Sequence, residues 1–200
     1  MNFNILNKSK EKIEHAKHFS DLDFLDSLIK TGELVTKITA LALVSSIEPS
    51  PQKFSYRLKY KLVRADGIGE WASIIYDLFS NVNYKINLSE EKLELSSSLK
   101  NGDWGFDAVT KLQEIINLIN GKEEKIATKI TLRDWFKKFA EIRNASAHQR
   151  ISRDKIKAIS LKLEFSINAL MENFNLFNRS WFYLHKNISN AISIVPLSES

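Results

Sequence analysis

Apolar residues recur at intervals of three and four along most of the chain, and this period restricts the fold to packed amphipathic helices. The stretch after Thr131 shows it most clearly, because Leu132, Trp135, Phe136 and Phe139 trace one stripe. Similar patterns occupy residues 20–33, 33–48, 50–65, 70–80, 87–99, 107–120 and 152–177. The sequence therefore predicts an all-α fold, a bundle of helices around one apolar core.

The pattern changes after Phe177. Residues 179–200 are rich in aromatic and β-branched residues around an asparagine-rich centre, which favours a short hairpin or a linker. We expect one helical domain over residues 1–178, with its core at about 33–178. The β-prone tail at 179–200 is then either a linker or the start of a further domain.

Composition excludes several classes of protein. The chain has no cysteine, so disulfides, thiolate zinc sites and a cysteine nucleophile are excluded. No run approaches the roughly 18 apolar residues that span a bilayer. The N-terminus, MNFNILNKSKEK, lacks the apolar centre of a signal peptide. We expect a cytoplasmic protein with no membrane partner, no metal and no cofactor.

Positive charge gathers in one segment. Between Thr131 and Lys162 there are nine basic and three acidic residues, a net charge of +6, against +5 for the whole chain. Clustered lysine and arginine favour a polyanionic partner such as RNA, because they neutralise phosphates and release counterions. The alternative is a lysine-rich helix exterior that serves solubility.

The stretch EIRNASAHQR lies within this basic segment. Arg143 continues the apolar stripe, so its guanidinium needs an ion-pair partner, a cleft or a second chain. Asn144 and His148 are four residues apart and share a face. Arg143 and His148 are five apart, which is about 140° around a helix. One helix therefore does not by itself direct both side chains at one phosphate.

The segment WFKKFAEIRNASAH resembles the signature of the HEPN superfamily. Ribonucleases of that superfamily carry an arginine, then four to six residues, then a histidine, and a polar residue often follows the arginine. Arg143, Asn144 and His148 match this pattern with four intervening residues. The resemblance implies a HEPN-like helical bundle with the motif just before its last long helix.

The resemblance also implies a metal-independent endoribonuclease of the toxin or anti-phage type. Histidine acts as general acid or base, and arginine stabilises the charge of the phosphorane. Asn144 would orient His148 or bind phosphate. HEPN ribonucleases act as dimers with two motifs at one cleft, so the expected partners are RNA, a second copy of the chain, and an antitoxin or another defence protein. In some HEPN toxins an antitoxin modifies a tyrosine two residues after the motif histidine, and this chain has Arg150 at that position.

Other patterns leave alternatives open. A second arginine–histidine match, Arg179 and His185, lies among bulky aromatic residues and favours packing. Glu11, His15 and His18 have a spacing that permits zinc binding, and DGIGEW at 66–71 favours a turn between helices over a phosphate loop. The alternative function is a non-catalytic HEPN-type module that dimerises or binds RNA or a partner protein, including a regulatory part of a larger enzyme.

Overall fold

The computed structural model describes residues 4–48, 52–80, 85–125, 127, 129–186 and 192–196. The α-helices are α1 (Asn4–Lys17), α2 (Asp21–Ser45), α3 (Gln52–Arg64), α4 (Ile68–Ser80), α5 (Ser89–Ser96), α6 (Trp104–Asn120), α7 (Arg133–Ala147) and α8 (Ile156–Asn173). Short 3₁₀ helices, η1 (Arg153–Lys155) and η2 (Asn175–Asn178), flank α8. The prediction of an all-α fold is confirmed.

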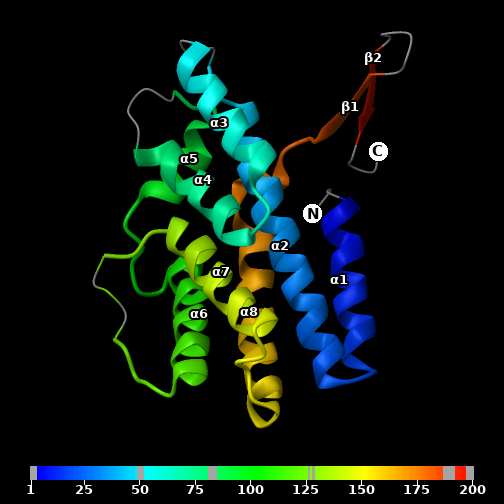
Figure 1. Cartoon of the computed structure of the whole chain (residues 1–200), viewed down its shortest axis with the longest axis vertical. Coiled ribbons are helices and arrows are strands. Elements are labelled where there is room, and N and C mark those ends of the chain that lie inside the picture. Colours follow the sequence, from blue (N-terminus) through cyan, green and yellow to red (C-terminus); the bar gives the residue numbers. More distant parts are fainter. Residues whose placement is uncertain are drawn as a thin grey trace.

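The helices form a bundle around α8. Figure 1 shows α8 packed between α2 and α6, with α1 along the outer side of α2. Helix α7 packs on α6 and α4, and α3 packs on α4. Buried residues extend into α1, where Leu6 and Ile13 are covered. Among the described helices, none is long and apolar enough to cross a membrane.

Helix α2 corrects the prediction of two helices at 20–33 and 33–48. It runs without a break through Gly32, after Ser20 caps it by accepting the backbone N–H of Asp23 at 3.0 Å. Gly32 is buried and has no room for a side chain, because a Cβ there would lie 2.2 Å from Cε2 of Phe139 on α7. The glycine serves close packing between two helices and does not end the first one.

The interior around α7 is aromatic. Trp135, Phe136 and Phe139 are fully buried, and the rings of Trp135 and Phe139 stack with centroids 5.2 Å apart. The Trp135 indole donates to Oγ of Ser166 at 2.8 Å, and that hydroxyl donates to the Ala108 carbonyl at 2.8 Å. One buried hydrogen-bond chain thus joins α7, α8 and α6, and it satisfies the Trp135 indole and the Ser166 hydroxyl.

Two further element boundaries differ from the prediction. The helix expected over 152–177 is α8 at Ile156–Asn173, with η1 before it and η2 after it. The helix expected over 87–99 is α5 at Ser89–Ser96, with Leu88 at the cap position and no side-chain hydrogen bond there. Both differences lie at helix ends, where local patterns constrain the chain least.

The tail forms a hairpin. Strands β1 (Phe182–Lys186) and β2 (Ile192–Pro196) pair antiparallel, with Leu184 opposite Ile194. Figure 1 shows the hairpin projecting from the helical body. Just before β1, Arg179 forks onto the fully buried carboxylate of Glu91 in α5, with an Nη2–Oε2 distance of 3.0 Å. This charge-assisted pair fastens the tail to the bundle.

The contact between Gly32 and Phe139 gives a first prediction. Gly32→Ala should lower the free energy of unfolding, since overpacking costs about 1–3 kcal/mol and outweighs the roughly 1 kcal/mol by which alanine favours a helix. Urea denaturation measures the change. Gly69→Ala in α4 is the matched control, because no atom lies within 4 Å of a Cβ there. Equal stability of the two variants would contradict the packing argument.

Glu94 in α5 gives a second prediction. Burial is the main cause that raises the pKa of Glu94 to about 7. The hydrogen bond from the backbone N–H of Asn175 lowers this pKa, and the charges of the nearby Glu91 and Glu90 carboxylates raise it. The folded chain thus holds a proton that the unfolded chain loses near its ordinary pKa of 4.5. Stability from this group therefore falls as pH rises from about 4.5 to 7.

Glu94→Gln should remove that loss. The amide oxygen still accepts the Asn175 N–H, and no buried carboxylate has to ionise. Thermal unfolding at a series of pH values should show the variant gaining stability over the parent as pH rises from 4.5 to 7. A stability difference that is constant across this range would contradict the shifted pKa.

Candidate functional site

The motif residues lie on the last turns of α7. Just before the helix, the backbone N–H of Thr131 donates to the Asp134 carboxylate at 2.8 Å, and Leu132 takes the cap position without a side-chain hydrogen bond. The buried stripe then fixes the rotation of the helix about its axis. The packing of the core therefore determines the directions in which the side chains of Arg143 and Asn144 point.

Arg143 faces α2. Its Nε donates to Oε1 of Glu33 at 2.5 Å, and the side chains of Arg143 and Glu33 are 35% and 23% exposed. The expectation that a guanidinium on this stripe needs a partner is met within the chain. Within the described residues, Glu33 is the one hydrogen-bond partner of this guanidinium, bound through Nε. The two terminal nitrogens therefore make no hydrogen bond within the described residues.

Asn144 faces the other way, into a cleft between α4 and α7. This cleft, here called the α4–α7 cleft, has a volume of about 510 Å³. Its lining residues are Gly69, Ala72, Ser73, Tyr76, Lys137, Ala140, Glu141, Asn144 and Arg150. The structure thus brings Asn144 together with the cations Lys137 and Arg150, and it does not bring Arg143 to the same cleft.

Tyr76 closes one side of this cleft. Its hydroxyl donates to the Asp134 carboxylate, and burial, followed by that hydrogen bond and the charge of Asp134, raises the pKa of Tyr76. The phenol therefore stays protonated, so it can act as a donor and not as a base. The guanidinium of Arg133 lies over the Tyr76 and Phe79 rings, with its carbon 5.4 and 5.1 Å from their centroids.

His148 caps the C-terminus of α7 and is exposed. Its backbone N–H donates to the Asn144 carbonyl at 3.0 Å. The backbone then turns through Gln149 at φ 54°, and the N–H groups of Gln149 and Arg150 donate to the carbonyls of Ser146 and Ala145 at 3.0 and 2.9 Å. This is a Schellman ending with glutamine at the left-handed position that glycine usually occupies.

The turn explains why Arg150 reaches the α4–α7 cleft. Reversal at Gln149 brings the chain back along α7, so Arg150 lines the cleft beside Asn144 while His148 stays at the tip of the helix. Within one chain, Arg143 points at α2 and Asn144 at α4. Arg143 and Asn144 of one chain therefore do not face the same ligand, and the divergence of Arg143 and His148 stays a prediction from helix geometry.

The structure divides the basic segment among several faces. Lys138, Lys155 and Lys162 contact α6 residues Gln113, Leu118 and Glu114, respectively. Arg133 covers aromatic rings and Arg143 pairs with Glu33. Lys137 and Arg150 remain at the cleft. The +6 charge of this segment therefore contributes only part of its cations to the candidate site.

The other sequence patterns are placed as follows. Arg179 of the second arginine–histidine match pairs with Glu91, and the His185 side chain lies outside the described residues. Of DGIGEW, Asp66 and Gly67 form the turn between α3 and α4, and the other four residues begin α4, where Glu70 accepts the backbone N–H groups of Asp66 and Gly67. In the described part of the chain, no three His, Cys, Asp or Glu side chains gather as a metal site requires.

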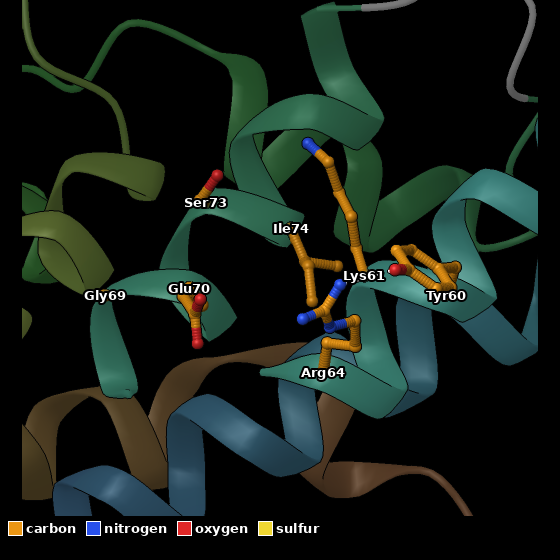
Figure 2. Close-up of a pocket in the computed structure, with 7 residues that line it drawn as sticks. All are labelled: Tyr60, Lys61, Arg64, Gly69, Glu70, Ser73 and Ile74. Atoms are coloured by element: carbon orange, nitrogen blue, oxygen red, sulfur yellow. Dashed lines mark hydrogen bonds between the residues drawn. The ribbon is translucent and has the colours of Figure 1, made fainter. Parts of the chain in front are cut away.

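Sequence reasoning missed one polar surface, on α3. Tyr60, Lys61 and Arg64 line a pocket of about 440 Å³ with Gly69, Glu70, Ser73 and Ile74 of α4. Figure 2 shows Tyr60 and Arg64 extending from α3 toward the α4 side of this pocket. The signal was the spacing of Tyr56, Tyr60 and Arg64, four residues apart on a helix, which places them on one face.

The left-handed residue at the end of α7 gives a third prediction. Gln149→Gly should raise the free energy of unfolding by about 1 kcal/mol, because glycine adopts this conformation without a Cβ clash. Gln149→Ala, which keeps the Cβ, is the matched control and should show no such gain. Chemical denaturation measures both. Equal stabilities would show that the turn carries no backbone strain.

Comparisons of the chain with protein-family models, with curated proteins and with solved structures gave no match. The helical architecture is therefore described from the chain itself. Membership of the HEPN superfamily stays a prediction that rests on residues 135–148 and on the place of this segment before α8.

Proposed function

We propose that the chain is a metal-independent endoribonuclease of the HEPN type, active as a homodimer in a toxin or anti-phage system. Arg143, Asn144 and His148 are its proposed catalytic residues. The observation that carries the proposal is the end of α7, where exposed His148 stands in the chain between Asn144 and Arg150, which line the α4–α7 cleft together with Lys137. Cations and a histidine around a cleft suit a phosphodiester substrate.

The proposed reaction is transfer within the RNA. A histidine takes the proton of the 2′-hydroxyl, and the 2′-oxygen forms a bond to phosphorus as the bond to the 5′-oxygen breaks. A second histidine gives a proton to the leaving 5′-oxygen. The products are a 2′,3′-cyclic phosphate and a 5′-hydroxyl end. The terminal nitrogens of Arg143 would hold the phosphorane oxygens, with Glu33 fixing the guanidinium through Nε.

One chain supplies one motif histidine, whereas this reaction uses a base and an acid. A dimer in which two α7 ends face one cleft supplies both, and it also brings an Arg143 from each side. Arg143, 35% exposed, and exposed His148 both lie on the last turns of α7, and their exposure is compatible with such a face. Asn144 then has the role of orienting His148 or binding a phosphate oxygen.

A non-catalytic helical module is the second candidate. The observation that favours it is the ion pair between Arg143 and Glu33, which gives the guanidinium a structural partner within the chain. In this case the arginine holds α7 to α2, and the same surface serves dimerisation or binding. The two candidates differ in the effect of removing the His148 side chain. Because His148 is exposed at a helix end, its loss should leave folding intact, so a loss of RNA cleavage would point to catalysis.

The fourth prediction separates these candidates. His148→Ala and Arg143→Ala should each lower the rate of cleavage of a labelled RNA by at least about 100-fold, because acid–base and electrostatic stabilisation each contribute on that scale. End analysis of the products should show cyclic phosphate and 5′-hydroxyl termini. His18→Ala and Arg153→Ala, at exposed sites outside the cleft, are the matched controls.

Circular dichroism and light scattering should show that folding and dimerisation of the His148 variant match the parent. Excess inactive His148→Ala chain, exchanged into the parent, should lower the activity per parent chain if the site is composite. Cleavage by the His148 or the Arg143 variant at the parental rate would rule out the catalytic assignment.

A further inference from the structure

Two hollows adjoin across the first turns of α4. Gly69 and Ser73 line both the α4–α7 cleft and the pocket between α3 and α4. Both residues are exposed, and no atom lies within 4 Å of the position of a Cβ on Gly69. The two hollows therefore adjoin at two small exposed residues of α4, and the surface from Asn144 and Arg150 over Gly69 to Tyr60 and Arg64 is called the groove here.

The α3 end of this groove presents aromatic rings to solvent. Tyr56 and Tyr60 are 70% and 48% exposed, and their rings are nearly parallel, with centroids 6.2 Å apart and an angle of 22°. The guanidinium of Arg64 lies 5.3 Å from the centre of the Tyr60 ring and donates to its hydroxyl. Tyr56, Tyr60 and Arg64 thus form a column of flat groups along one face of α3.

The charges along the groove favour an anion. Arg64, Lys137 and Arg150 line it together with Lys61, which is paired with Asp77, whereas its lining carboxylates are Glu70 and Glu141. Glu70 is bound to the backbone N–H groups of Asp66 and Gly67, and these hydrogen bonds lower its pKa, with a further contribution from the charge of Arg64. The Glu70 carboxylate is therefore hydrogen-bonded to the turn before α4.

Flat rings and cations along a groove suit a strand whose bases are unpaired. Nucleobases stack on tyrosine whatever their sequence, and phosphates follow the basic side chains. In a duplex the bases stack on each other and their faces are not available. The groove thus fits a single strand better than a helical one.

We propose that this groove binds single-stranded RNA, with a base stacked on Tyr60, another on Tyr56, and phosphates at Arg64 and Arg150. This proposal rests on the proposed ribonuclease function for the role of the strand, which leads into the motif on α7. The binding itself is independent of cleavage. The aromatic column selects unpaired RNA, and the cations at the cleft hold the phosphates on the way to His148.

The fifth prediction tests this groove by fluorescence anisotropy. The full chain carries His148→Ala so that the RNA stays intact, and the probe is a labelled single-stranded oligoribonucleotide of mixed sequence. Tyr60→Ala should raise Kd by about 5-fold or more, the effect of losing one stacked base, whereas Tyr60→Phe keeps the ring and should bind within about 2-fold of the parent. Phe19→Ala removes an aromatic side chain, 67% exposed, outside the groove and should leave Kd unchanged.

Arg64→Ala should reduce the slope of log Kd against log salt concentration by about 0.7, the value for one lost phosphate contact to a single strand. A duplex of the same sequence should bind more weakly than the single strand. Circular dichroism verifies that the Tyr60 variants fold as the parent does.

Three results would overturn the groove. They are equal Kd values for Tyr60→Ala and Tyr60→Phe, a duplex that binds as tightly as the single strand, and no binding of RNA by the parent. If the α3 surface binds a partner protein instead of RNA, the third of these results is expected. If Tyr60→Ala weakens binding but His148→Ala still cleaves, the groove stands and the ribonuclease assignment fails.

Discussion

The contact between the Phe139 ring and the backbone of α2 at Gly32 determines how the candidate site is built. A side chain at Gly32 would occupy the space of the ring, so the two helices can approach this closely only with glycine there. Glu33 follows Gly32 on α2, and Arg143 lies one turn beyond Phe139 on α7. The same crossing that buries the ring therefore sets the carboxylate against the guanidinium, and core packing and site geometry have one origin.

Helix α7 has a different neighbour on each side, and this divides the motif. The α2 side holds Arg143 by an ion pair, while the α4 side leaves a cleft that Asn144 and Arg150 line. A helix cannot turn both sides toward one ligand. The division accounts for the requirement for a second chain in the proposed reaction, and it leaves the α4 side of each chain to guide a substrate.

Periodicity predicted most helices and the face that each one buries, because apolar spacing is a local property of the sequence. Trp135 and Phe139 were placed in the core on this basis, and both are buried. The same approach misread Gly32 as a boundary, since its reason lies in a ring 107 positions away on another helix. It also could not supply Glu33 as the partner of Arg143, or the junction at Gly69, because each depends on which helices become neighbours.

The end of α7 holds the one non-glycine residue with a positive φ in the described part of the chain, Gln149. The left-handed backbone conformation of Gln149 costs about 1–2 kcal/mol more than it would for glycine. Gln149 stands in the chain between His148 and Arg150. Two backbone hydrogen bonds maintain the turn, from Gln149 and Arg150 to the last carbonyls of the helix. A conformer in which this turn opens moves the histidine relative to the cleft while the buried rings of α7 stay in place. A change of backbone conformation at this one residue would therefore alter the site without repacking the core.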